Sequence, residues 1–270
     1  MPYSSMITLS STGPPDRLPG PIPMIRSLRC HSSRRKRPAS VSVCRCSSCR
    51  TATRYATAKM LATIDRMSGG RLIAGIGAGW NEPEFKALGV PFLERGARTT
   101  EYLRIWQACW APGEVSFAGR FFSFSDMHVS PKPLQQPHPP IWIGGSSDAA
   151  LRRAARFAAV WQPTPTPLDD LIGRQASLRR ACDQIGRQHP PETRMSFRVE
   201  FSPITGNSPP AGGRRPIGQG TPAEIAADLL RYREAAGLNS FQINFQGCHS
   251  LDQLLASMDC FMREVKPLVT

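Results

Sequence analysis

The stretch RLIAGIGAGWNEPEF, Arg71–Phe85, begins as a short apolar run and ends in glycines at alternate positions. A dinucleotide-binding turn has the spacing Gly-x-Gly-x-x-Gly, and its third glycine lets the following helix pack closely on the strand. Here the spacing is Gly75-x-Gly77-x-Gly79, and Trp80 stands where that third glycine would be. The bulky indole argues against a Rossmann turn. The stretch instead indicates a buried strand whose end keeps bare backbone, either to relieve packing or to lie beside a flat ligand or a phosphate.

A second glycine-containing stretch favours the ligand interpretation. IWIGGSSDAALRRAA, Ile141–Ala155, has the pattern of a short strand that ends at Gly144-Gly145, after which Ser146 or Ser147 caps a helix. The free N–H groups at the start of such a helix can bind a phosphate. Gly-Ser is also a common structural cap, so this pattern alone leaves both interpretations open.

Strand and helix patterns alternate along the rest of the chain after about Ala58. Such alternation predicts a parallel sheet, in either a doubly wound fold or an eight-stranded barrel. A small hairpin is expected around Gly119, and capping boxes are expected at Asn81 with Glu84 and at Thr221 with Glu224. The strands are expected near Leu72, Ile141, Val160, Phe197 and Phe241, and the main helices over 58–67, 94–110, 146–160, 168–186, 221–237 and 250–265.

Composition limits the classes of protein that fit. The chain has 270 residues, of which 40% are hydrophobic, which is enough for one large domain. It has no apolar run of about 18 residues, so no membrane span is expected, and no apolar segment typical of a secretory signal follows the N-terminus. The formal net charge is +14, but residues 1–58 hold ten basic residues and a single acid. Because this charge comes with Ser, Pro and Cys and without interleaved aromatics, we expect no nucleic-acid partner.

Three segments together resemble the luciferase-like monooxygenase superfamily, the bacterial flavin- and deazaflavin-dependent (β/α)8 barrels. They are LATIDRMSGGRLIAGIGAGWNEPEFKALGVPFLERGART, FSFSDMHVSPKPLQQPHPPIWIGGSS and AALRRAARFAAVWQP. The resemblance extends from about Lys59 to Val265 and is strongest to the coenzyme F420-dependent oxidoreductases, while FMN-dependent members share the same signatures. It implies an α/β chain of the (β/α)8 TIM-barrel type that transfers hydride at coenzyme F420 or FMN, in some members with monooxygenation.

The resemblance also implies where the cofactor lies. It would bind at the carboxyl-terminal mouth of the barrel, with Ile76, Gly77 and Asn81 beside it after one strand. The loop on the phosphate side would be formed by Gly144, Gly145, Ser147 and Asp148. The resemblance assigns no catalytic residue in this chain, and no metal is expected.

The first 58 residues show neither periodicity nor family resemblance, whereas the first three βα units of the barrel should precede Ala58. Three explanations remain open. The favoured one is a reading-frame shift or other disruption, with family sequence resuming near Ala58. A cleavable transit peptide would fit the richness in Arg and Ser. A zinc knuckle would use Cys30, His31, Cys44, Cys46 and Cys49, although Cys-x-Cys-x-x-Cys is not a paired Cys-x-x-Cys spacing.

We therefore expect a cytoplasmic flavin- or deazaflavin-dependent enzyme with a small-molecule substrate, able to form a homodimer, made of a non-family segment 1–58 and a barrel domain 59–270. The alternatives are a truncated, non-catalytic remnant and a nucleic-acid-binding protein with a basic arm. Arg214-Arg215 could reach a substrate carboxylate or the cofactor tail, or lie in a solvated loop. Trp161 and Gln162 could face the ligand or the core.

Overall fold

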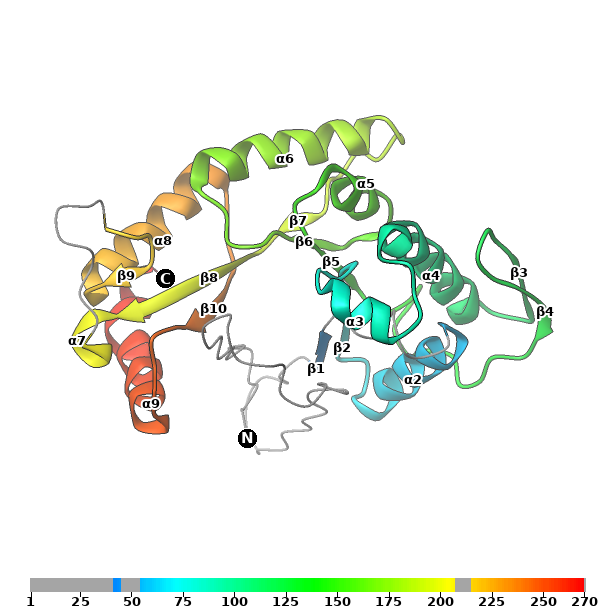
Figure 1. Cartoon of the computed structure of the whole chain (residues 1–270), viewed down its shortest axis with the longest axis horizontal. Coiled ribbons are helices and arrows are strands. Elements are labelled where there is room, and N and C mark those ends of the chain that lie inside the picture. Colours follow the sequence, from blue (N-terminus) through cyan, green and yellow to red (C-terminus); the bar gives the residue numbers. More distant parts are fainter. Residues whose placement is uncertain (1–40, 45–53, 207–214, 270) are drawn as a thin grey trace. The chain divides into compact units, whose positions relative to one another are not determined.

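The structure is a computed structural model that describes residues 41–44, 54–206 and 215–269. These residues form two compact units (Figure 1). The N-terminal unit comprises residues 41–44, 54–162 and 177–192, and the C-terminal unit comprises residues 163–176, 193–206 and 215–269. Helix α6 (Leu168–Asp183) contributes residues to both. The two glycine stretches both lie in the N-terminal unit.

A parallel sheet carries the glycine stretches. Its order is β1 (Val41–Cys44), β2 (Leu72–Ile76), β5 (Ile141–Gly144), β6 (Val160–Gln162) and β7 (Glu192–Thr193). The ladders β1–β2, β2–β5 and β5–β6 are parallel. Alternate residues of the central strands are fully buried, as the apolar patterns predict, since successive side chains of a strand point to opposite faces of the sheet. The buried set is Leu72, Ala74, Ile76, Ile141 and Ile143.

Helices α2 (Arg54–Met67), α3 (Glu82–Ala87), α4 (Arg95–Trp110) and α5 (Asp148–Phe157), with the 3₁₀ turn η1 (Phe92–Glu94), complete the N-terminal unit together with a hairpin, β3 (Val115–Ala118) and β4 (Ser123–Met127). Helix α2 is fastened to the segment that leads into β5. The fully buried Asp65 accepts hydrogen bonds from the main-chain N–H groups of Leu134 and Gln135 at 2.7 and 2.9 Å. Such bonds satisfy a carboxylate whose burial would otherwise be costly, so this contact holds α2 against the segment before β5.

The C-terminal unit has its own small parallel sheet, in the order β10 (Phe241–Phe245), β8 (Met195–Phe201) and β9 (Gln219–Gly220). Its helices are α7 (Ser202–Thr205), α8 (Pro222–Ala236), α9 (Leu251–Cys260), the π-helical turn η2 (Phe261–Val265) and α10 (Lys266–Val269). The capping box of Thr221 and Glu224 is present, and Gly237 ends α8 in the left-handed conformation at φ 64°. Both predictions for this helix are confirmed.

The five expected strands are all present, but two local predictions are wrong. A strand, β1, lies inside the segment 1–58 that was expected to lack strand structure, and α2 begins at Arg54 rather than Ala58. The strand has only four residues, too few to give a clear alternation among basic and polar neighbours. Its parallel pairing with β2 also corrects the expectation that no strand of the barrel precedes Leu72. The assignment of the remaining residues up to 58 to a non-family segment stays a prediction.

The second error concerns Asn81, which takes the N-cap position of α3 but makes no capping hydrogen bond with its side chain. An N-cap side chain normally accepts from the N–H of the second or third helical residue. Pro83 is the second residue of α3 and has no N–H, so one of the two usual donors is missing. The start of α3 is therefore correctly placed by the sequence, but the capping box is not formed.

Candidate cofactor site

The carboxyl ends of β2 and β5 lie side by side in the sheet. The ladder pairs Ile76, the last residue of β2, with Ile143 of β5, so Gly77 and Gly144 follow at the same edge. A Cβ added at Gly144 would lie 3.8 Å from the main-chain oxygen of Ile76. The structure thus brings together two groups of predicted site residues that are more than sixty positions apart in the sequence. Ile76 is buried, whereas Gly77 and Gly144 are half-buried.

The turn after β5 is rigidly held. The N–H of Gly145 donates to the main-chain oxygen of Gln162 at 3.3 Å, and the oxygen of Gly145 accepts from the indole Nε1 of Trp161 at 2.8 Å. Gly145 has φ 107°, a conformation open to glycine but strained for other residues. Both polar groups of this residue are therefore used inside the fold, and the turn is fixed before any ligand arrives.

Helix α5 begins directly after this turn. Ser147 is the N-cap, and its hydroxyl accepts from the N–H of Ala150 at 3.2 Å. Of the two serines that the sequence left open, Ser147 is therefore the cap. Asp148 is the first helical residue and is exposed, in a position where a carboxylate is favoured by the helix dipole.

The remaining predicted site residue, Asn81, is half-buried and follows β2 at the start of α3. Along the chain it comes four residues after Gly77 and five after the end of β2. The part of the chain between them includes Gly79, which has φ 91° and whose oxygen accepts from Arg95 Nε at 3.2 Å. The backbone between the two predicted contacts is therefore fixed by α4.

Trp161 does not face a ligand. Its side chain is completely buried, and its N–H is used by Gly145. The sequence left the core and the ligand as alternatives for this residue, and the structure places it in the core. Its contribution to the site is indirect, because it holds the turn that carries Gly145.

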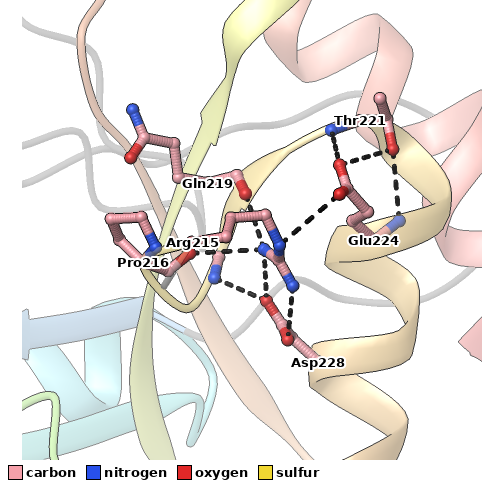
Figure 2. Close-up of polar contacts among 7 residues, drawn as sticks. Arg215, Pro216, Gln219, Thr221, Glu224 and Asp228 are labelled. Carbon is pink, nitrogen blue, oxygen red and sulfur yellow. Dashed lines mark hydrogen bonds and ion pairs between the residues drawn. The ribbon is translucent and has the colours of Figure 1, made fainter. Parts of the chain in front are cut away.

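Arg215 does not offer a free guanidinium for a substrate. It forms two hydrogen bonds with the Asp228 carboxylate, Nη1–Oδ2 at 2.8 Å and Nη2–Oδ1 at 2.9 Å, and its Nε lies 3.6 Å from Glu224 Oε1. Figure 2 shows this group, in which Nη1 also donates to the main-chain oxygen of Gln219 at 2.6 Å. The hydrogen bonds with Asp228 raise the pKa of Arg215. The expectation of a solvated or ligand-facing arginine is therefore wrong for Arg215, and Arg214 lies outside the described residues.

Glu224 completes this group. Its carboxylate accepts from the N–H and the hydroxyl of Thr221, both at 2.8 Å. The hydrogen bond from the Thr221 N–H is the main cause that lowers the pKa of Glu224, followed by the bond from the hydroxyl. The cluster of Arg215, Glu224 and Asp228 thus fastens the loop before α8 to the first turns of that helix.

The described residues contain no group of three or more His, Cys, Asp or Glu side chains that could hold a metal ion. The zinc-knuckle candidates Cys30, His31, Cys46 and Cys49 lie outside the described residues, and only the backbone of Cys44 is described. In the described part of the chain, no helix has the length and apolar character needed to cross a membrane.

Comparison with known proteins identifies the family. Residues 51–211 match the family described as luciferase-like monooxygenase. This chain belongs to the luciferase-like monooxygenase family. The predicted resemblance is thereby confirmed, and so is the α/β fold with a parallel sheet.

Among relatives, the FMNH(2)-dependent dimethylsulfone monooxygenase of Pseudomonas putida is 46% identical over 104 residues, which cover 37% of this chain and 29% of that protein. An uncharacterized protein of Mycobacterium bovis is 37% identical over 113 residues, covering 42% of this chain and 40% of its own. The chain therefore aligns with less than half of either relative. A relative from Pseudomonas fluorescens is also named an FMNH(2)-dependent dimethylsulfone monooxygenase, and two solved structures with a similar fold are named for F420.

Solved structures show the same fold. An F420-dependent secondary alcohol dehydrogenase in complex with an F420–acetone adduct aligns with a TM-score of 0.71 at 17% identity, over 86% of this chain and 80% of that one. Monooxygenase RslO1 from Streptomyces bottropensis aligns with a TM-score of 0.66 at 21% identity, over 86% and 77%. At these identities the alignments establish the fold and not the activity.

Proposed function

We propose that this chain is a flavin- or deazaflavin-dependent oxidoreductase that binds FMN or coenzyme F420 at the carboxyl ends of β2 and β5. The observation that carries the proposal is the register of these strands, which sets Gly77 beside Gly144. Ligands of parallel α/β sheets bind outside the carboxyl ends of the strands. Family membership supports the choice of cofactor, and the predicted contacts are Ile76, Gly77, Asn81, Gly144, Gly145, Ser147 and Asp148.

The residues at this edge fit a flat cofactor with a phosphate. Gly77 and Gly144 leave the backbone without side chains, so that a ring system can approach closely. The structure fixes the turn at Gly145 in advance, and preorganised sites bind with less loss of conformational entropy. When bound, the flavin-type ring supplies the hydride chemistry, while these residues bind and orient it.

A binding titration tests the proposal. Purified full-length chain is titrated with FMN and with coenzyme F420 while the fluorescence of each cofactor is followed, and Gly144→Val is compared with the wild type. The valine places carbon atoms over the strand edge and is expected to weaken binding at least tenfold, equivalent to about 1.4 kcal/mol. Gly173→Ala, on α6 and with nothing within 4 Å of the added Cβ, is the matched control. Absence of saturable binding of both cofactors to the wild type would refute the proposal.

The name of one relative suggests the class of substrate. The Pseudomonas putida protein is named for dimethylsulfone, and we infer that this chain acts on a small organic molecule as well. Dimethylsulfone, with reduced FMN and oxygen, is the first substrate to test. Turnover of a secondary alcohol with F420 in place of sulfone oxidation would assign the chain to the dehydrogenase branch instead.

A second candidate is a non-catalytic remnant of such an enzyme. The observation that favours it is that, in the described residues, β10 pairs only with β8 and is an edge of its sheet. Open edges promote association, which also supports the inference of a homodimer. Light scattering during size-exclusion chromatography measures the oligomeric state, and a dimer that binds no cofactor would favour the remnant.

The four described free cysteines support the inference of a cytoplasmic location, since disulfides are rare there.

A further inference from the structure

Trp80 is unusually exposed. Its side chain is 83% accessible, whereas Trp106, Trp110 and Trp161 are at most 3% accessible and Trp142 is half-buried. Tryptophan is highly buried on average because its large apolar surface is costly to leave in water. The exposure of Trp80 is therefore not explained by packing within the N-terminal unit.

The main chain on both sides of Trp80 is fixed. Before it, the oxygen of Gly79 accepts from Arg95 Nε at 3.2 Å, and the Arg95 guanidinium lies 3.8 Å from the centre of the Phe92 ring. After it, Asn81 begins α3 and its oxygen accepts from the N–H of Phe85 at 3.4 Å. The indole thus extends from backbone that is hydrogen-bonded on both sides, which lowers the entropic cost of using it as a contact surface.

The position of Trp80 is at the cofactor edge. It follows the last residue of β2 by four positions and lies between two predicted cofactor contacts, Gly77 and Asn81. An indole has an electron-rich face that stacks on flat rings. The charged groups that follow it on α3 are Glu82 and Glu84 in the first turn and Lys86 in the last, and the Arg95 guanidinium is already engaged. With two carboxylates in the first turn of α3, a flat and largely uncharged ring fits beside Trp80 better than a phosphate does.

We infer that the Trp80 indole contacts the tricyclic ring that FMN and coenzyme F420 share, and that binding of the ring buries this side chain. This inference rests on the proposed function. It assigns Trp80 to the cofactor site, in addition to the glycine backbone and the residues around the α5 N-terminus. Trp80 is a binding residue in this role and takes no part in proton transfer.

Fluorescence of the tryptophans tests the inference directly. Acrylamide quenches exposed indoles, so the difference between wild type and Trp80→Phe defines the signal of Trp80. The full-length chain is then quenched with and without saturating FMN, and again with coenzyme F420. Because a flavin-type ring in contact with an indole quenches its emission, we expect either bound cofactor to remove the acrylamide-sensitive Trp80 component from the spectrum, with the buried tryptophans unaffected by acrylamide in both states.

Affinity gives a second readout. Loss of one ring-stacking contact by substitution with alanine typically costs enough to raise Kd about tenfold, and this is the expected result for Trp80→Ala. Trp80→Phe keeps an aromatic face and should change Kd less than about threefold. Leu93→Ala is the control, because Leu93 is also exposed, at 91%, and is not assigned to the site. Circular dichroism confirms that each variant folds.

The outcomes separate the two proposals. If the cofactor binds with unchanged Kd to Trp80→Ala, or if bound cofactor leaves Trp80 equally quenchable, the role of Trp80 is refuted while the proposed function stands. If neither cofactor binds the wild type, both are refuted. An equal loss of affinity in Leu93→Ala would also overturn the inference, since it would show a general effect of removing apolar surface from this unit.

Discussion

Gly145 follows β5 directly and contacts both β6 and α5. Its N–H and its oxygen are both bonded to β6, through Gln162 and Trp161. A Cβ at this position would lie 3.3 Å from the Cβ of Ala150 on α5, which is close contact, and φ is 107°. Glycine is therefore required here by conformation and by space, whether or not a ligand binds. This explains the second glycine of the Gly144-Gly145 pair.

The hydrogen bond from Trp161 can be isolated by a matched pair of substitutions. Trp161→Phe removes the donor to Gly145 and should lower the free energy of unfolding by about 1–2 kcal/mol more than the change in ring size alone. Trp106→Phe makes the same change at a buried indole whose Nε1 has no partner among the described residues. Urea denaturation measures both variants. Equal destabilisation of the two would show that the bond to Gly145 contributes nothing.

A thiol provides a prediction about pH. Burial, followed by the charge of Glu264, raises the pKa of Cys260 to about 11. The reactive form is the thiolate, and a raised pKa keeps the thiol protonated at neutral pH. Alkylation of Cys260 by iodoacetamide should therefore be slow at pH 8 and rise about tenfold per pH unit until the pH approaches that pKa. Mass spectrometry of labelled peptides measures this, and Glu264→Gln should shift the profile to lower pH. A pH-independent rate would contradict the prediction.

At the scale of elements, the hairpin β3–β4 is held by one carboxylate from α4. Glu101 is buried and accepts from the N–H groups of Phe121 and Phe122, the latter at 2.8 Å. The sequence predicted the hairpin around Gly119, but only the structure shows why a glycine is needed. A Cβ at Gly119 would lie 2.3 Å from Glu101 Oε1, so any side chain there displaces the carboxylate.

Substitution of this glycine tests the arrangement. Gly119→Ala should destabilise the fold by about 1–3 kcal/mol, as overpacking generally does. Gly173→Ala, inside α6 with open space around the added Cβ, should be neutral or stabilising by up to about 1 kcal/mol. Chemical denaturation compares the two. A neutral Gly119→Ala would show that the hairpin can move away from Glu101 at no cost.

The cluster of Arg215, Glu224 and Asp228 joins the loop before α8 to the first turns of that helix (Figure 2). Asp228 also accepts from the N–H of Gly218 at 2.7 Å, so its removal takes two hydrogen bonds from the half-buried Arg215 guanidinium and leaves the buried Gly218 N–H without its partner. Asp228→Ala should therefore cost about 3 kcal/mol, near the range for breaking a buried ion pair. Asp183→Ala, at the exposed end of α6, is the control for loss of a carboxylate. Thermal unfolding measures both variants. If Asp228→Ala loses less stability than Asp183→Ala, the cluster does not stabilise this part of the fold.

Glu224 of the same cluster makes the stability of the fold depend on pH. The folded state lowers the pKa of Glu224, so its contribution to stability is fully present above its unfolded pKa. That contribution is lost as the pH falls through the lower, folded value. Glu224→Gln should therefore reduce the dependence of stability on pH in the acidic range and leave the slope above neutral pH unchanged.

At the scale of the whole molecule, β1 is the feature that the sequence missed. Its parallel ladder with β2 pairs Val41 with Leu72 and Cys44 with Gly75, so it covers the outer edge of the strand that leads to the predicted site. A strand edge without such cover is prone to association. Residues 41–44 of the N-terminal segment are therefore part of the folded sheet.

Two truncations test this. Deletion of residues 1–53 removes β1 and should give a lower thermal midpoint and more aggregation than deletion of residues 1–40, which keeps β1. Differential scanning fluorimetry and light scattering provide the measurements. If both truncations behave alike, the β1–β2 ladder does not stabilise the chain.

Local patterns in the sequence were sufficient for much of the fold. The alternation in Leu72–Ile76, the Thr221 capping box and the left-handed Gly237 involve residues close in the chain, and their physics is local. One error is local as well, because Pro83 leaves Asn81 without one of the usual N–H partners of a cap. The partners of Arg215 and the pairing of Val41–Cys44 depend instead on residues far away in the sequence, which periodicity cannot locate. The same holds for the choice between core and ligand that the sequence left open for Trp161.

The sequence by itself determined the alternation of strands and helices and the two glycine stretches, because apolar period, caps and bare glycines are encoded in neighbouring residues. Its resemblance to known members indicated the family and, through it, the candidate cofactor contacts. Only the tertiary structure decided that these stretches adjoin, since the register of Ile76 with Ile143 arises from pairing across the sheet. The tertiary structure also decided that Trp161 is buried while Trp80 is exposed. The two are the same residue type, and which of them meets solvent depends on what surrounds each in the folded chain.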